Sequence, residues 1–315
     1  MNRNRIFRHS PAAGVLLMFL VLLFFGCNNQ HSLPEADTAS KGTINISVDE
    51  SFRPVIEEEI KVYESSFPET RIIAHYKTEA DCFRDLFRDT ATRMIIATRG
   101  LNDREESFFK DSLNYVPSWD DVASDAVTIV INRKNTDTLF TLDRLKKQLS
   151  GTYGRKQTIV FDGLNATSTV RFAVDSILHG EHFDTTVVKA VKNSREVLDY
   201  VATDPDAIGF VGISWIGNPE DSAQVNMLKK IKMAYVRCEH CADTPYVRPT
   251  QLGILAKRYP LVRGLYYIIR ENYSGLASAF ANFMQYERGQ LIFRRAYLGE
   301  RMGFAIRQVT IQEKL

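Results

Sequence analysis

Hydroxyl side chains are concentrated in three short loops of this sequence, each between a strand-like and a helix-like stretch. The loops cover residues 47–52, 76–80 and 164–169. Each places a Ser or Thr at the first turn of a helix, where free backbone N–H groups and the positive end of the helix dipole attract an anion. Ser and Thr are also the preferred N-caps of any helix, so one such loop alone is weak evidence. Several helix ends that converge would bind an oxyanion with little formal charge.

Arg99 adds a positive charge to this set, because it follows the strand-like stretch 94–98. A planar guanidinium group can bind two oxygens of one oxyanion at once. The competing interpretation is a surface ion pair with Glu105 or Glu106. We predict an anion site of hydroxyls, backbone N–H groups and one arginine, with the ion pair as the alternative.

Alternating strands and helices would position these loops. The predicted strands cover residues 44–48, 71–76, 93–98, 126–131, 158–161, 207–211 and 252–256. The predicted helices begin near residues 51, 79, 142 and 168, and two more cover residues 276–286 and 290–297. Repeated strand–loop–helix units predict an α/β fold with a largely parallel sheet flanked by helices. Ligands of such sheets bind at the carboxyl ends of the strands, where the hydroxyl-rich loops lie.

The N-terminus has the pattern of an exported lipoprotein. Arginines at positions 3, 5 and 8 precede the apolar run 12–25, and Gly26 and Cys27 follow. The run is shorter than the ~20 apolar residues of a transmembrane helix, and it is typical of a signal peptide. We predict a signal peptide over residues 1–26 and acylation of Cys27. The alternatives are an ordinary signal peptide and an uncleaved anchor.

Residues 27–41 are polar and contain a proline, which predicts a flexible tether between the lipid and the folded part. Asn28 rather than Asp follows Cys27, which in lipoproteins favours the outer membrane over the inner one. The expected location is the cell envelope, lipid-anchored and facing the periplasm.

The mature chain would be nearly neutral. The sequence has 40 Lys and Arg against 38 Asp and Glu, and loss of the three N-terminal arginines leaves 37 against 38. This balance gives no electrostatic basis for binding nucleic acid. The length allows one large domain or two lobes of ~100 to 150 residues.

Cys238 and Cys241 have CxxC spacing. A zinc site would need a second pair of ligands, and a redox site would need a strand-to-helix context. A local disulfide is the simpler interpretation in an oxidising compartment, and a redox or metal role is the alternative. Cys82 lies in a helix-like stretch and is predicted to be a buried free thiol. We expect no metal and no cofactor.

Catalytic motifs are missing from the sequence. The histidines show no recognisable pairing with a nucleophile, and neither GxSxG nor HExxH occurs. We therefore predict that the protein is not an enzyme.

Several segments between residues 42 and 309 carry a family pattern. The most specific are Ala97-Thr98-Arg99, Ile208-Gly209-Phe210-Val211-Gly212, Tyr259-Pro260-Leu261 and Gly289-Gln290. In this order, and with ISVDESFRPVIEEEI near the start, the chain resembles the periplasmic phosphate-binding proteins of ABC transporters. The resemblance implies a monomeric two-lobed clamp of the periplasmic-binding-protein type II fold, each lobe a mostly parallel sheet flanked by helices. Lobe I would be residues 42–124 plus 224–315, and lobe II residues 125–223.

The resemblance also implies the residues that bind the anion. In the first lobe they are Ser51 and Phe52, the hydroxyl of Thr78, and Thr98 with Arg99.

The loop of the second lobe departs from the family pattern. Thr167, Ser168 and Thr169 keep hydroxyls, but Ala166 replaces a familiar serine and Asp162 stands where a basic residue is usual. Arg171, one turn later, could supply the missing charge.

We predict an extracytoplasmic solute-binding lipoprotein that captures phosphate or a similar tetrahedral oxyanion for the permease subunits of an ABC importer. Asp49 and Asp81 are candidates to accept a hydrogen bond from a protonated phosphate. The alternative is a degenerate clamp that acts as an envelope ligand sensor or assembly component without transport.

Replacing Cys27 by Ser should release the protein into the soluble envelope fraction or block its processing, because the thiol that would be acylated is lost. Fractionation and labelling with a radioactive fatty acid check this expectation. Unchanged lipid labelling of the Cys27→Ser variant would contradict it.

Overall fold

The computed structural model describes residues 37–155, 157–163, 166–242 and 245–303. The contacts divide the chain after Ala36, and every described residue belongs to the unit that begins at Asp37. The predicted signal peptide, the predicted acylation site Cys27 and most of the predicted tether lie outside the described residues. In the described part, no helix combines the length and the apolar character needed to cross a membrane.

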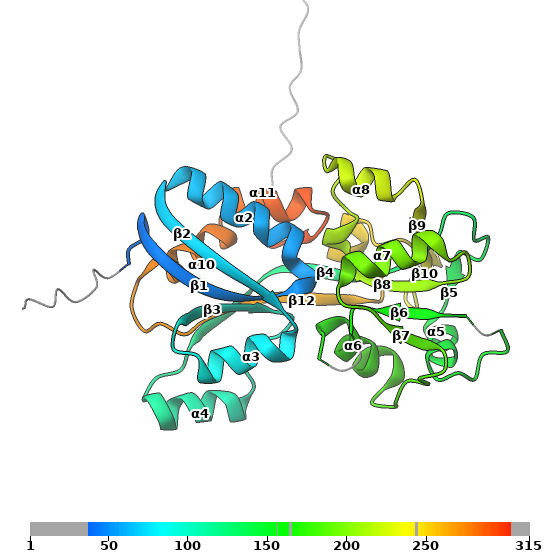
Figure 1. Cartoon of the computed structure of the whole chain (residues 1–315), viewed down its shortest axis with the longest axis horizontal. Helices are drawn as coiled ribbons and strands as arrows, with labels where there is room; N and C mark the ends of the chain where they lie inside the picture. Colours follow the sequence, from blue (N-terminus) through cyan, green and yellow to red (C-terminus); the bar gives the residue numbers. More distant parts are fainter. Residues whose placement is uncertain (1–36, 156, 164–165, 243–244, 304–315) are drawn as a thin grey trace, which may run out of the picture. The chain divides into compact units, whose positions relative to one another are not determined.

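The first half of this unit is a parallel sheet with a helix after each strand (Figure 1). The chain runs through β1 (Lys41–Asp49), the short η1 (Glu50–Phe52), α2 (Arg53–Ser66), β2 (Glu69–Lys77), α3 (Glu79–Arg88), β3 (Thr92–Ala97) and α4 (Asp103–Leu113). Successive side chains of β3 point to opposite faces. Met94 and Ile96 therefore join the main core, whereas Ile95 and Ala97 pack in a second cluster under α3 and α4.

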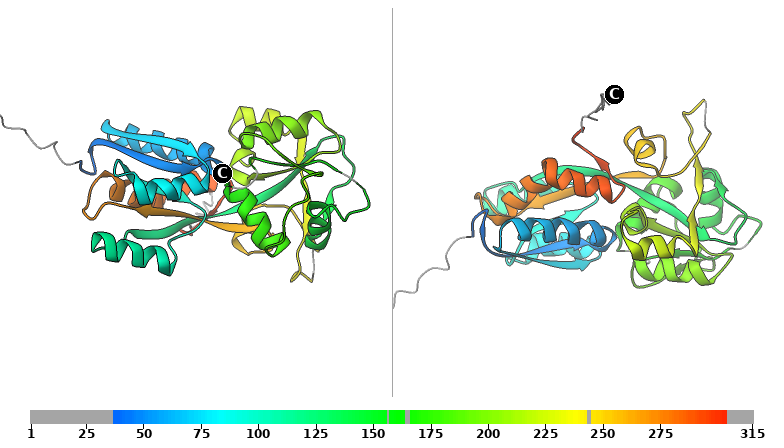
Figure 2. Two further views of the ribbon diagram at one scale, coloured as in Figure 1. Left: turned by 60° about the horizontal axis from the view of Figure 1, so that its bottom comes forward. Right: turned by 90° about the horizontal axis from the view of Figure 1, so that it is seen from above.

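The second half repeats the scheme. Parallel strands β6 (Ile159–Phe161), β7 (Val188–Ala190) and β8 (Ile208–Gly212) lie side by side. Its helical segments are α5 (Leu142–Leu149), α6 (Ser168–Ala173) with η2 (Val174–Leu178), α7 (Ser194–Thr203), η3 (Ile213–Trp215) and α8 (Ser222–Met227). Figure 2 shows these segments grouped apart from those of the first half.

Strand β4 (Ser118–Asn132) joins the two halves. Residues up to Ala126 pair with the antiparallel strand β12 (Val262–Ile269), and residues from Val127 pair with β8. The strands consequently form one path, β2-β1-β3-β12-β4-β8-β6-β7. The fold is the two-lobed α/β clamp that the sequence predicted, with a mixed sheet, because the strands at the junction are antiparallel.

The C-terminal third differs from the predicted division. It contains β9 (Ile231–Met233), β10 (Tyr235–Arg237), β11 (Tyr246–Val247), α9 (Gln251–Leu255), α10 (Leu276–Gln285), α11 (Glu287–Arg295) and β13 (Gly299–Glu300). Strand β9 pairs with the second part of β4, and β10 pairs with β5 (Leu139–Phe140). The predicted boundary at residue 224 would separate these partners, so we propose that the second half extends to Val247.

The predicted strand at residues 252–256 is wrong, because this segment forms helix α9. The side chain of Thr250 caps the helix by accepting from the N–H of Gly253. Leu252 remains 72% exposed, so its apolar character did not indicate a buried strand.

A buried ion pair ties the two crossing strands together. Asp125 of β4 and Arg263 of β12 are register partners, and Arg263 Nε donates to Asp125 Oδ2 over 2.7 Å. Their side chains are 0% and 3% exposed. A buried charge whose partner is removed has no compensation for its lost hydration.

Replacing Asp125 by Ala should lower the free energy of unfolding by ~3 to 5 kcal/mol, because it leaves the Arg263 guanidinium buried and unpaired. Chemical denaturation measures the change. The control is Glu220→Ala, which breaks an exposed ion pair with Arg295 and should change stability by less than about 1 kcal/mol. Equal effects of the two substitutions would contradict the expectation.

Candidate functional site

Three hydroxyl groups meet where the two halves touch. Ser51 of η1 lies 3.2 Å from Ser168 and 3.3 Å from Thr169, measured between hydroxyl oxygens. Ser168 and Thr169 are the first two residues of α6. All three side chains are buried. The first and third hydroxyl-rich loops of the sequence therefore converge.

Carboxylates fix the conformation of both loops. The Asp49 side chain caps η1 by accepting from the N–H of Ser51 at 3.0 Å. The Thr167 side chain caps α6, and its hydroxyl donates to Asp162 at 2.9 Å. Thr169 donates to the other oxygen of Asp162 at 3.2 Å. Asp162 thus accepts hydrogen bonds from two of the predicted hydroxyls, and its side chain is buried.

Arg263 brings a positive charge into this cluster. Its Nη1 donates to the Ser168 hydroxyl at 2.9 Å, and the guanidinium carbon lies 5.3 Å from the centre of the Phe52 ring. Several buried atoms of the described residues lack a hydrogen-bond partner of normal geometry, Asp125 Oδ1 among them, and two others belong to this cluster, Arg263 Nη2 and Asp49 Oδ2. One is a donor and the other an acceptor, and buried polar atoms of this kind call for partners.

Burial makes the carboxylates of the cluster weak acids. Burial is the largest cause that raises the pKa of Asp49 to about 7. The negative charge of Glu79 raises this pKa further, and the positive charge of Arg263 lowers it. Burial likewise raises the pKa of Glu50 to about 7, although hydrogen bonds from Ser194 oppose it. Burial also raises the pKa of Asp125 and Asp162. Because this setting disfavours a bare dianion, a ligand that carries its own proton fits better.

A second set of contacts joins α3 to α6. Glu79, the first residue of α3, accepts from the Thr98 N–H at 3.0 Å, from the Thr98 hydroxyl, and from Arg171 Nε at 2.7 Å. Arg171 Nη2 donates to the Thr98 hydroxyl at 2.6 Å. Burial alone would raise the pKa of Glu79, but the hydrogen bond and charge of Arg171 lower it below its ordinary value. Glu79 is therefore an ionised carboxylate at neutral pH.

Two predicted ligand residues, Thr78 and Arg99, make their hydrogen bonds with side chains outside the hydroxyl cluster. The Thr78 hydroxyl caps α3 and donates to Asp81 at 2.8 Å. Arg99 makes two hydrogen bonds to Glu105, at 2.7 and 2.8 Å, and its guanidinium carbon lies 3.7 Å from the centre of the Phe83 ring. The structure thus places Arg99 in the ion pair that was the competing interpretation.

The sequence did contain a signal for Arg263. In β12 and the residue before it, Leu261, Leu265 and Tyr267 are buried at every second position, and Arg263 falls on the same side. An arginine at an inward position of a strand needs a buried partner. The carboxylate that meets it, Asp125, sits 138 residues away in the chain, so its identity could not be read from local spacing.

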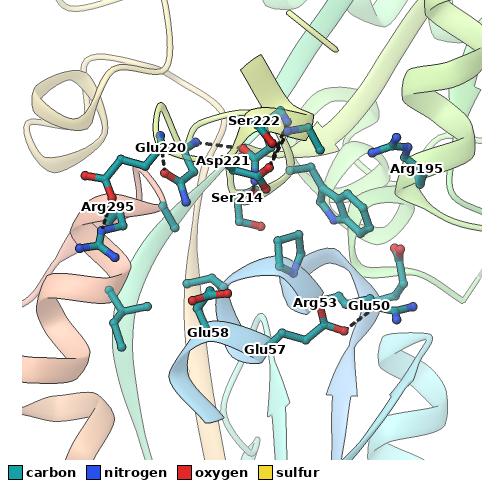
Figure 3. A pocket seen from close by; sticks show the side chains of 18 of the residues that line it. Glu50, Arg53, Glu57, Glu58, Arg195, Ser214, Glu220, Asp221, Ser222 and Arg295 are labelled. Atoms are coloured by element: carbon teal, nitrogen blue, oxygen red, sulfur yellow. Dashed lines mark hydrogen bonds and ion pairs between the residues drawn. The ribbon is translucent and has the colours of Figure 1, made fainter. Parts of the chain in front are cut away.

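An open groove of about 960 Å³ lies next to the cluster (Figure 3). The Ser214 hydroxyl on its wall donates to the carbonyl oxygen of Ser51 at 3.1 Å. The charged residues of the groove are mostly acidic. The acidic ones are Glu50, Glu57, Glu58, Glu196, Glu220 and Asp221, and the basic ones are Arg53, Arg195 and Arg295. An excess of carboxylates repels anions, so the groove is a poor oxyanion site.

The described cysteines form one disulfide and leave one buried thiol. Cys238 and Cys241 form a disulfide, and Cys82 is a buried free cysteine. Within the described ranges, no three His, Cys, Asp or Glu side chains form a group that could hold a metal ion.

The fold agrees with the comparisons to known proteins. Residues 33–288 match the family model described as a PBP superfamily domain, and the chain belongs to that superfamily. No curated protein sequence matches the chain.

Several solved structures share the fold. One is described as a phosphate ABC transporter substrate-binding protein with bound phosphate from Clostridium perfringens, with 17% identity, a TM-score of 0.66, and coverage of 83% of this chain and 100% of that one. An ABC-type phosphate transport receptor from Vibrio cholerae has 17% identity and a TM-score of 0.59, over 82% and 100% of the two chains. The CcmR regulatory domain from Synechocystis in complex with 2-PG has 8% identity and a TM-score of 0.53, over 78% and 96%.

Stability should fall as the pH rises from about 4 to about 7, because the folded-state pKa of Asp49, about 7, lies above its ordinary value of 3.8. Over that range the folded protein binds more protons than the unfolded chain. Above pH 7 the stability that protonation of Asp49 contributes is lost completely. Asp49→Asn keeps a capping side chain and should be more stable than the wild type at pH 8, by on the order of 1 to 4 kcal/mol, with little gain at pH 4.

Urea denaturation at a series of pH values measures this difference. Glu58→Gln, a change at an exposed carboxylate, is the control and should leave the pH dependence unchanged. An Asp49→Asn variant with the same pH dependence as the wild type would show that Asp49 titrates normally in the folded protein.

Proposed function

We propose that this protein binds phosphate, or a similar tetrahedral oxyanion that carries a proton, between its two halves and delivers it to the permease of an ABC importer. The observation that carries the proposal is the pair of buried atoms without partners, the donor Arg263 Nη2 and the acceptor Asp49 Oδ2. A singly protonated phosphate supplies the complement of both, an anionic oxygen and an acidic O–H.

The hydroxyls of the cluster fit the remaining oxygens. Ser51 and Ser168 come from two helical N-termini, so each can turn its O–H toward a central acceptor, whereas the Thr169 hydroxyl donates to Asp162. Hydrogen bonds to a charged acceptor contribute about 1.5 to 3 kcal/mol each. A few such bonds suffice for tight binding without a second fixed cation.

Asp49 would distinguish phosphate from sulfate. Sulfate has no proton at neutral pH, so its oxygens would face the Asp49 carboxylate as an unscreened like charge. A protonated phosphate would donate a hydrogen bond there instead. Because the pKa of Asp49 is raised to about 7, this selection depends on the ionised form, since a neutral Asp49 can donate to an oxygen of either anion.

Entry of the anion requires that the halves separate, since Ser51 and Ser168 are already within hydrogen-bonding distance. The crossing strands β4 and β12 are the natural pivot, because residues before and after Ala126 pair with different halves. Ligand contacts made only in the closed state would then stabilise closure, as in other hinged binding proteins.

The comparisons support this assignment. The superfamily match and the shared fold concern most of the described chain. The structure from Clostridium perfringens contains bound phosphate and the one from Vibrio cholerae is a phosphate transport receptor, and we extend that ligand to this chain because the cluster meets its chemical needs. We also propose that the protein binds its ligand without catalysis, and the match to the PBP superfamily supports this.

The envelope setting is part of the proposal. A signal peptide over residues 1–26 and an acylated Cys27 would tether the protein to a membrane on its periplasmic side, next to the permease subunits. We propose that it acts as a monomer, since each chain contributes both halves of the site.

Calorimetry of the purified, phosphate-stripped protein against phosphate and sulfate tests the function. The wild type should bind phosphate and prefer it to sulfate, and Ser51→Ala should weaken phosphate binding at least about tenfold, which corresponds to ~1.4 kcal/mol. Asp49→Asn should reduce the preference for phosphate. The control is Ser222→Ala, a hydroxyl of the acidic groove, and it should have no effect.

A wild type that gives no heat with either anion would overturn the proposal and favour a sensing or assembly role for the clamp. A loss of binding in Ser222→Ala with none in Ser51→Ala would move the site to the groove.

A further inference from the structure

In the second set of contacts between the halves, the Glu79 carboxylate is bound in the way an external oxyanion would be. The Glu79 carboxylate accepts from a backbone N–H, a hydroxyl and an arginine side chain. These are the three donor types that the sequence predicted for the external oxyanion. The donors come from both halves, since Thr98 follows β3 and Arg171 belongs to α6.

We propose that Glu79 is an internal competitor of the bound anion: its carboxylate occupies Thr98 and Arg171, closes the clamp without ligand, and must be displaced when phosphate binds. This inference rests on the proposed function and adds a residue that sets its affinity. Thr98 was expected to bind the ligand, and Arg171 becomes an anion-binding residue in place of Arg99, which is held by Glu105.

The contacts around Glu79 differ from those of a residue needed only to fix the fold. Helix α3 is already capped by Thr78, so Glu79 is not required as its cap. Arg171 has a second carboxylate within its own helix, Asp175, at 3.2 Å. After Glu79 is released, Arg171 would keep the ion pair with Asp175, and its remaining N–H groups would be free to bind an incoming anion.

The position of Glu79 makes the competition effective. Its side chain is 5% exposed, whereas that of Arg171 is 38% exposed, so water reaches the pair from the Arg171 side. Glu79 also lies close enough to Asp49 to affect the proton affinity of that residue. A negative charge at this place opposes any second anion in the cluster, whichever hydroxyls that anion uses.

One further contact reports on closure. The Ala80 N–H, next to Glu79, donates to the carbonyl oxygen of Ala166 in the other half at 3.2 Å. This hydrogen bond exists only while α3 and the loop before α6 are together. Hydrogen exchange of a peptide that contains Ala80 therefore measures opening on this side of the clamp.

The experiment combines calorimetry with phosphate and hydrogen exchange of the ligand-free protein. Glu79→Gln should bind phosphate at least about tenfold more tightly than the wild type, because the competing charge is gone. Its Ala80 peptide should exchange faster without ligand. Glu79→Asp, whose shorter side chain cannot keep both contacts, should change both readouts in the same direction. Adding Arg171→Gln to Glu79→Gln should remove the gain in affinity.

Glu105→Gln is the matched control, because it breaks a carboxylate–arginine pair that lies within the first half. It should leave phosphate affinity within about twofold, a change of less than ~0.5 kcal/mol, and should leave the exchange of the Ala80 peptide unchanged. Thermal melting of each variant identifies any that fail to fold.

The outcomes separate this inference from the proposed function. If the wild type binds phosphate and neither Glu79 variant binds more tightly, the competition is overturned while the function stands. If no protein in the set binds phosphate, the function fails, and exchange decides the rest: faster exchange in Glu79→Gln supports closure by Glu79, and unchanged exchange overturns it.

Discussion

The buried pairing of Arg263 with Asp125 is the interaction on which the rest of this structure depends. A guanidinium group that is 3% exposed persists only with a carboxylate beside it, and Asp125 provides one from the neighbouring strand. The pair fixes β12 against β4 at the point where β4 leaves the first half and enters the second. It also holds the guanidinium so that one edge faces Ser168 and one nitrogen has no partner among the described residues. The junction of the halves is thus both the structural anchor and the place where we propose that the anion binds.

The same junction explains how closure and binding are linked. Ser51, Glu50 and Glu79 of the first half each contact the second half through Ser168, Ser194 and Arg171. Such contacts replace water on polar groups in both halves, so each contributes only a small net free energy. A clamp closed by several weak internal contacts can reopen, and a ligand with better complementarity can take their place. In the proposed function, carboxylates among these contacts would determine which anions are accepted, since buried acids favour ligands that carry a proton.

The fold could be predicted from the sequence to a large extent, because local periodicity and capping residues indicate where helices and strands begin and end. Ser51, Ser168 and Thr169 could be selected because each begins a helix, and the structure brings them together. Partners far apart in the chain were not accessible in this way. Arg99 stood out by its place after a strand, but nearby Glu105 binds it, whereas Arg263 was hidden inside an apolar strand and paired with a distant aspartate. For the same reason we propose a boundary beyond residue 224, since the pairing of β9 with β4 is long-range. The predicted strand at residues 252–256 was wrong because Leu252 and Leu255 of α9 are apolar although they are exposed.

A crystal structure of the protein grown with phosphate tests the central claim most directly, because it locates the anion relative to the two partnerless atoms. Our account predicts phosphate between Ser51 and Ser168, with one oxygen within hydrogen-bonding distance of Arg263 Nη2 and another within that distance of Asp49 Oδ2. Phosphate bound only in the acidic groove or on the surface, with the hydroxyl cluster unchanged, would contradict it.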